Sequence, residues 1–210
     1  MRKGRVLNFK IMNGLFSFLS KNKALLSATV FYIAGLFLGV FSYSKNSSID
    51  NFNLRFLESF IEVRSDTSFL KIFIDSFFSA MTSISVFFVL GASMFGMIAI
   101  PFIIMYKGFS YGAVAALLYN TYALKGIAFN TVLILPSALL LSLILLWAFG
   151  ESVNFSFILA RLTFFDTEKT SINQSFKRYC LKYLSFVGFA VIVALSDALI
   201  SYNFMEKFKL

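Results

Sequence analysis

The chain has 210 residues, of which 59% are hydrophobic and 14% are charged, and its formal net charge is +9. A soluble domain needs more charge than this to cover its surface, and 29 phenylalanines are more apolar surface than a water-exposed fold of this size hides. The composition therefore excludes an ordinary soluble domain. It predicts an all-α, polytopic membrane helical bundle of about five transmembrane helices, with amphipathic interfacial helices in addition.

Residues 1–23 contain six basic residues and no acid, which predicts a cytoplasmic tail. Within this tail, residues 6–19 fit an amphipathic helix at the headgroup level and a solvated tail equally well. Residues 24–43 are uncharged over twenty positions, which is the length of one crossing. A cleaved signal peptide is disfavoured because the apolar run is long and no A-x-A-like site follows it, so we predict a retained first span.

Residues 44–75 have a different composition, with acidic and basic residues interleaved among Phe and Ile. Residues 65–68 are Ser-Asp-Thr-Ser, which is typical of a break followed by a new helix N-cap. We predict one or two amphipathic helices at the outer membrane surface. The apolar residues that recur at spacings of three and four, as on one helix face, are Ile49, Phe52, Phe56, Phe60 and Val63.

Residues 76–106 are uncharged over 31 positions, which is longer than one span needs. Tilt or an interfacial lead-in absorbs the excess, so we expect the second crossing near 83–105. Pro101 removes a backbone hydrogen bond and predicts a kink. Lys107 marks the predicted end of this span.

Residues 108–124 and 126–150 are uncharged stretches separated by Lys125, and they predict a helical hairpin. Pro136 lies inside the second arm. A re-entrant pair that never fully crosses is the competing interpretation, because the first arm has only seventeen residues. Residues 151–182 form a charged cytoplasmic segment, and 183–205 form the last predicted span.

The basic residues are placed between the apolar spans, where they orient a membrane protein. Five crossings with the N-terminus inside put twelve of the nineteen Lys and Arg residues on the cytoplasmic side. We therefore predict a multi-pass cell-membrane protein with a cytoplasmic N-terminus and an extracytoplasmic C-terminus. A nucleic-acid-binding protein is not expected, because such a module clusters its basic residues on one folded face.

The residue types that carry most enzymatic chemistry are scarce. The chain has no histidine and one cysteine, Cys180, which excludes a Ser–His–Asp triad, a Cys/His zinc site and an intramolecular disulfide. Glu58 and Glu62 share a helix face at i, i+4 spacing. Arg55 and Arg64 lie close by, however, so a solvated amphipathic face accounts for all four. We predict no enzymatic activity, no cofactor and no metal site.

Two pairs of glycines lie four residues apart within apolar stretches, Gly35 with Gly39 and Gly108 with Gly112. Small residues at this spacing let helices approach closely in lipid, where packing drives association. The contact is either with another span of the same chain or with a second copy in a homo-oligomer. The sequence leaves both open.

Asp197 interrupts the last predicted span. A carboxylate inside a span costs about 2.5–3.5 kcal/mol on insertion scales, so it must face protein or water, pair with a base or stay protonated. One interpretation is an ion or proton site. The other is a buried polar anchor, bonded to a Ser, Thr or Asn side chain or to a backbone group freed near Pro101 or Pro136.

The order of several short motifs resembles the stage II sporulation protein M family. These motifs cover nearly the whole chain. The sequence departs from the family at two places: the family more often has Glu than Asp in the last span, and it more often has polar or charged residues where Ser137 and Ala138 follow the proline of the fourth span. The residues that carry the resemblance are Gly91 and Gly96 within Leu90–Gly96, Pro101, Lys107, Gly108, Gly112, Leu135-Pro136, Gly150, Phe155-Ser156, Arg178-Tyr179 and Asp197.

The resemblance implies a role in endospore formation. Members sit in the mother-cell membrane at the septum and act as a scaffold for the peptidoglycan hydrolases D and P of the same stage during engulfment of the forespore. The expected partners are therefore these hydrolases and the lipid bilayer. The alternative is a small transporter or channel subunit that uses Asp197, and a membrane-embedded enzyme is a third, weaker class.

Overall fold

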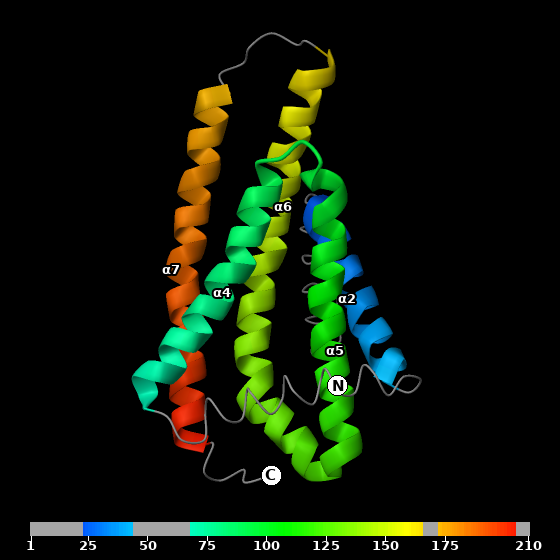
Figure 1. The fold of residues 1–210 in the computed structure, drawn as a ribbon, viewed down its shortest axis with the longest axis vertical. Coiled ribbons are helices and arrows are strands. Elements are labelled where there is room, and N and C mark those ends of the chain that lie inside the picture. The colour runs from blue at the N-terminus through cyan, green and yellow to red at the C-terminus, as the bar shows by residue number, and fades with distance from the viewer. Residues whose placement is uncertain (1–22, 44–67, 166–171, 205–210) are drawn as a thin grey trace, which may run out of the picture.

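The computed structural model describes residues 23–43, 68–165 and 172–204. Its helices lie side by side as an up-and-down bundle (Figure 1). The all-α membrane bundle predicted from composition is thereby confirmed. In chain order the elements are α2 (Lys23–Tyr43), α4 (Phe69–Gly91), α5 (Gly96–Phe129), the π-helical turn η1 (Asn130–Ile134), α6 (Leu135–Phe165) and α7 (Ile172–Phe204).

Four helical stretches in the described ranges are long and apolar enough to cross a membrane. One of them, Gly96–Thr163, has 68 residues and would measure about 100 Å as a straight helix, far more than one crossing. It doubles back at Ala123, the one residue inside α5 with non-helical backbone angles. The part of α5 before Ala123 and α6 then run antiparallel (Figure 1). The described helices α2, α4, α5, α6 and α7 thus supply five arms of the bundle. Both antiparallel arms are longer than the roughly 20 residues that a crossing needs, which favours a full crossing over a re-entrant pair.

The predicted boundary between the second and third spans is wrong. The stretch 76–106 is not one helix, because α4 ends at Gly91 and α5 begins at Gly96 after a short turn. Lys107 consequently lies inside α5 and does not end a span. The turn contains no charged residue, so the uncharged stretch 76–106 gives no sign of it in the pattern of charges. The two glycines that flank the turn are its local signal in the sequence.

The other helix ends also extend past the predicted limits. Helix α4 begins at Phe69, within the segment 44–75 predicted to lie at the surface; residues 44–67 and 1–22 lie outside the described residues. The described parts of the segment 151–182 are two helix ends, because α6 continues to Phe165 and α7 begins at Ile172; residues 166–171 lie outside the described residues. The described charged residues of this segment lie on these two helices, and they are Glu151, Arg161, Lys177, Arg178 and Lys182.

The two prolines behave differently from each other. Pro101 lies in the second turn of α5, where the backbone angles stay helical, and the kink predicted there stays a prediction. Pro136 is the second residue after η1, whose wider turn bonds the Leu135 N–H to the Asn130 carbonyl. A π-helical turn next to a proline compensates for the backbone hydrogen bond that is missing because proline has no N–H.

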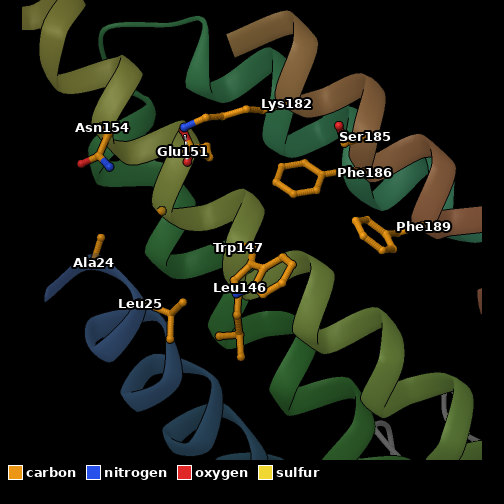
Figure 2. Close-up of a pocket in the computed structure, with 11 residues that line it drawn as sticks. Ala24, Leu25, Leu146, Trp147, Glu151, Asn154, Lys182, Ser185, Phe186 and Phe189 are labelled. Atoms are coloured by element: carbon orange, nitrogen blue, oxygen red, sulfur yellow. Dashed lines mark hydrogen bonds and ion pairs between the residues drawn. The ribbon is translucent and has the colours of Figure 1, made fainter. Parts of the chain in front are cut away.

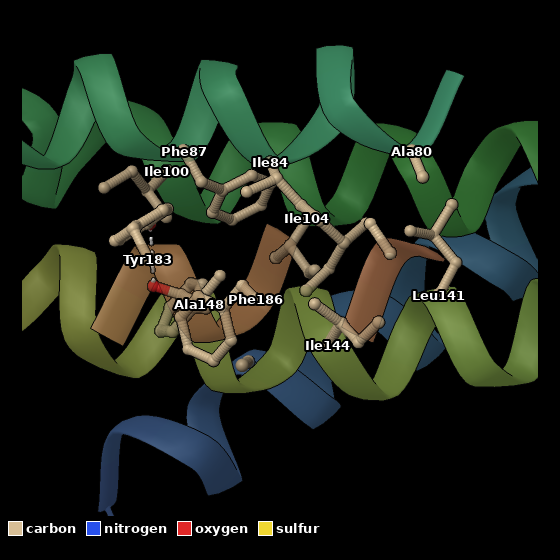
Figure 3. Packing of buried hydrophobic residues seen from close by; sticks show 14 of the residues in the cluster. Ala80, Ile84, Phe87, Ile100, Ile104, Leu141, Ile144, Ala148, Tyr183 and Phe186 are labelled. Carbon is tan, nitrogen blue, oxygen red and sulfur yellow. Dashed lines mark hydrogen bonds between the residues drawn. The ribbon is translucent and has the colours of Figure 1, made fainter. Parts of the chain in front are cut away.

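The main core lies where α4, α5, α6 and α7 meet (Figure 3). Phe87 and Ile104 are fully buried there, and many apolar side chains on the outer surfaces of the same helices are exposed. This pattern, apolar inside and outside, is expected when lipid is the solvent. The labelled core residues are Ala80, Ile84, Phe87, Ile100, Ile104, Leu141, Ile144, Ala148, Tyr183 and Phe186.

Candidate functional site

The two glycine pairs meet each other. A Cβ built on Gly35 would overlap the Met105 carbonyl oxygen of α5, and one built on Gly39 would overlap that of Phe109. From the other side, a Cβ on Gly108 would overlap the Tyr32 carbonyl oxygen of α2. Helices α2 and α5 therefore touch backbone to backbone, which is possible only because all four positions lack side chains.

This contact selects one of the two interpretations of the glycine spacing. Gly35, Gly39, Gly108 and Gly112 are all buried between helices of the same chain. A second copy has no access to these residues in this arrangement. The contact also fixes α2 against α5, although the two helices are separated by α4 in the sequence.

The turn between α4 and α5 is held by a serine of α6. The α5 N-cap residue, Phe95, has no side chain that accepts a hydrogen bond. Ser156 Oγ supplies the missing acceptor and takes the Met97 N–H at 2.8 Å. The same hydroxyl donates to the Ser93 carbonyl at 2.7 Å. Ser156 is fully buried, so one side chain from another helix satisfies the Met97 N–H and adds a hydrogen bond to the Ser93 carbonyl, which also accepts the Gly96 N–H at 3.1 Å.

The end of α4 is capped in the same way from α6 and α7. Tyr179 donates its hydroxyl to the Phe88 carbonyl at 2.9 Å, and Ser152 donates to the Phe87 carbonyl at 3.0 Å. Ser152 is also hydrogen-bonded to the Tyr183 hydroxyl. The Phe88 carbonyl also accepts the Ala92 N–H at 3.1 Å, so Tyr179 adds a second hydrogen bond at this helix end.

Stacked aromatic rings pack around these hydrogen bonds at the end of α4. The Tyr179 ring lies between those of Phe88 and Phe155, with centroid distances of 5.2 and 4.5 Å. A Cβ on Gly91 would collide with the Tyr179 hydroxyl and with the Ser152 backbone. Gly91 is thus required where tyrosine and serine reach the end of α4. Arg178, next to Tyr179, is exposed.

These residues explain why the motifs of the sequence stand where they do. Gly91, Gly96, Ser156 and Tyr179 come from three distant stretches and converge on one turn. Tyr183 and Ser152 also belong to this cluster, but the sequence motifs did not identify them as candidate site residues. The signal for them is the i, i+4 spacing of Ser152 with Ser156 and of Tyr179 with Tyr183, which places each pair on one helix face.

The predicted intramembrane acid is a contact between helices. Asp197 of α7 is 2% exposed, and its carboxylate accepts a hydrogen bond from the Ser76 hydroxyl of α4. This geometry matches the buried anchor bonded to a serine side chain. Lys107 is half-buried in α5.

Charged residues mark one level across the bundle. Glu151 of α6 and Lys182 of α7 form an ion pair at 2.6 Å. Ala24, next to Lys23, lies beside Gly150 at the same level. From Lys182 to Phe204, α7 covers about 33 Å, close to the thickness of a bilayer hydrocarbon core. The parts of α6 and α7 beyond Glu151 and Lys182 continue for roughly 15–20 Å more.

The described residues hold no group of three or more His, Cys, Asp or Glu side chains that fits a metal ion. The geometry that they do provide is mechanical: helices locked by glycine contacts, a capped turn and a buried carboxylate. Such an arrangement holds the helices firmly against one another, and the described ends of α6 and α7 extend beyond the other helices (Figure 1).

The family model described as Stage II sporulation protein M matches residues 28–201. The matched stretch begins and ends on buried residues, Ala28 of α2 and Ser201 of α7. No curated protein and no solved structure matches the chain.

Proposed function

The chain belongs to the stage II sporulation protein M family, and from this premise we propose that it is a membrane scaffold for peptidoglycan hydrolases. It recruits and localises stage II sporulation proteins D and P at the septum during endospore engulfment. The observation that carries the proposal is the family match over residues 28–201, nearly the whole chain. The scaffold itself performs no catalysis and leaves the cutting of the wall to its partners.

The proposed orientation places the N-terminus in the cytoplasm and the C-terminus outside. One end of the bundle holds the α4–α5 turn, the start of α2 and the projecting ends of α6 and α7 (Figure 1). Among described residues that end carries five basic side chains, and the opposite end carries Lys71 and Lys125. The positive-inside rule assigns the more basic end to the cytoplasm. The five are Lys23, Arg161, Lys177, Arg178 and Lys182.

In this orientation the connection between α2 and α4 lies on the side of the wall. Segment 44–75, with the C-terminal residues nearby, is the proposed docking surface for the hydrolases. The hairpin 151–182 is the proposed cytoplasmic surface.

The test exchanges residues 49–64 for a Gly/Ser linker of equal length, which keeps the connection between α2 and α4. Tagged scaffold is co-expressed with proteins D and P, solubilised and pulled down. The variant is expected to lose both hydrolases at an unchanged level of membrane-inserted scaffold. The matched control exchanges residues 166–171, on the opposite side, and is expected to keep them. Recovery of both hydrolases with the 49–64 variant would refute the proposed surface.

The buried carboxylate of Asp197 is the observation that favours a transporter or channel subunit as the second candidate. Its bond to Ser76 supports a structural role instead. Proton or ion flux into liposomes containing the purified chain, abolished by Asp197→Asn, would decide for the transporter.

A further inference from the structure

A groove opens between the first turn of α2, α6 and α7, and its two ends differ in chemistry (Figure 2). Its volume of about 460 Å³ is large enough for part of a lipid molecule. The apolar part includes Leu25, Trp147 and Phe189, and the polar end is formed by Glu151, Asn154 and Lys182.

The groove spans the boundary between headgroups and hydrocarbon. Trp147 is 53% exposed and is the only tryptophan of the chain, and its ring meets Phe189 edge to face with centroids 6.5 Å apart. Tryptophan is enriched at the headgroup level of membrane proteins. The polar end lies one helical turn further along α6, at the level of the Glu151–Lys182 ion pair.

The charges at the polar end distinguish between headgroups. Lys182 and Asn154 donate hydrogen bonds, whereas the Glu151 carboxylate only accepts them. A headgroup with negative charge alone suits Lys182 but is repelled by Glu151. A headgroup with a phosphate and a primary ammonium satisfies both side chains, and a choline headgroup has no N–H to donate to Glu151.

We propose that this groove binds a phospholipid with a phosphoethanolamine headgroup. The phosphate lies against Lys182, the ammonium against Glu151, and an acyl chain follows Trp147 and Phe189. The proposal rests on the membrane placement of the bundle and is independent of the proposed recruitment of hydrolases.

Trp147 provides the measurement, because brominated acyl chains quench tryptophan fluorescence at short range. The full chain is placed in nanodiscs that contain a minor fraction of brominated lipid in a non-brominated background. Exposed ion pairs contribute up to about 1 kcal/mol, so brominated phosphatidylethanolamine should be enriched about threefold to fivefold over brominated phosphatidylcholine. The preference should fall stepwise through the monomethyl and dimethyl headgroups.

Glu151→Gln is expected to abolish this preference, and Glu151→Asp to keep it. Lys177→Gln is the matched control, because it removes an exposed charge of α7 that does not line the groove. Helix content by circular dichroism verifies that each variant is folded. If Glu151→Gln does not fold, the methylation series on the unaltered chain decides alone.

Three results would overturn the proposal. The first is equal quenching by all headgroups, which means that only ordinary annular lipid contacts Trp147. The second is stronger quenching by brominated phosphatidylglycerol than by phosphatidylethanolamine. The third is a preference for ethanolamine that survives in folded Glu151→Gln.

Discussion

Gly108 carries a hydrogen atom where any other residue would place a Cβ against the Tyr32 carbonyl oxygen. Gly108→Ala is therefore expected to lower the free energy of unfolding by about 1–3 kcal/mol, because the two backbones must separate and lose contact along the interface. Denaturant or thermal unfolding of the purified protein in detergent measures the change.

Gly188 of α7 is the control for this prediction. Nothing lies within 4 Å of a Cβ built there, and alanine is a better helix former than glycine by up to about 1 kcal/mol. Gly188→Ala should leave stability unchanged or raise it. Equal destabilisation by both substitutions would contradict the backbone contact between α2 and α5.

Ser156 is the next residue whose effect follows from its bonds. Ser156→Ala leaves the Met97 N–H without its acceptor, whereas the Ser93 carbonyl keeps the Gly96 N–H, and a buried unsatisfied group costs about 1–3 kcal/mol. We expect faster hydrogen exchange at the Met97 amide and lower stability. Ser196→Ala is the control, since that hydroxyl bonds only to its own helix at Ile192. Equal exchange rates at Met97 in both variants would refute the capping role.

Asp197 connects α7 to α4 through Ser76. Asp197→Asn keeps an oxygen that accepts the Ser76 hydroxyl and should yield a folded protein that elutes as the unaltered chain does in size-exclusion chromatography. Asp197→Leu removes the acceptor and should lose the folded peak or melt at lower temperature. A leucine variant as stable as the asparagine variant would contradict the anchor.

At the scale of elements, the fold-back between α5 and α6 is made without glycine at its tightest point. Ala123 has φ 48° and ψ −124°, a conformation that glycine adopts far more readily than alanine. Such strain costs about 1–3 kcal/mol. The hairpin could be predicted from the polar break at Lys125, but its turning residue could not, because alanine normally continues a helix.

Ala123→Gly should consequently stabilise the protein by about 1 kcal/mol, since it relieves the strain at a small entropic cost in the unfolded chain. Ala123→Val should destabilise it, because a branched side chain tolerates positive φ least. Melting temperatures of the two variants give the comparison. Destabilisation by glycine would mean that the turn is not strained at this residue.

At the scale of the whole molecule, the orientation can be tested by accessibility. Cys180 is first replaced by serine, and single cysteines are introduced at Leu124, which is 81% exposed at the fold-back, or at Thr170. A membrane-impermeant maleimide added outside intact cells should label position 124 and not 170, because the basic end is cytoplasmic. A single cysteine introduced at position 60 should be labelled from outside as well, as at position 124. Labelling of 60 and 170 from the same side would refute the five-crossing topology.

The sequence by itself determined that the chain is a helical membrane bundle, because composition and uncharged length depend only on how residues partition between water and lipid. It also predicted from Gly35, Gly39, Gly108 and Gly112 that two helices touch. Only the tertiary structure decided that these pairs meet each other, that the third arm begins at Gly96, and that Asp197 bonds to Ser76. These outcomes depend on which side chains meet across helices. An uncharged turn capped by Ser156 and Tyr179 from distant segments leaves no local charge signal, so packing alone places it.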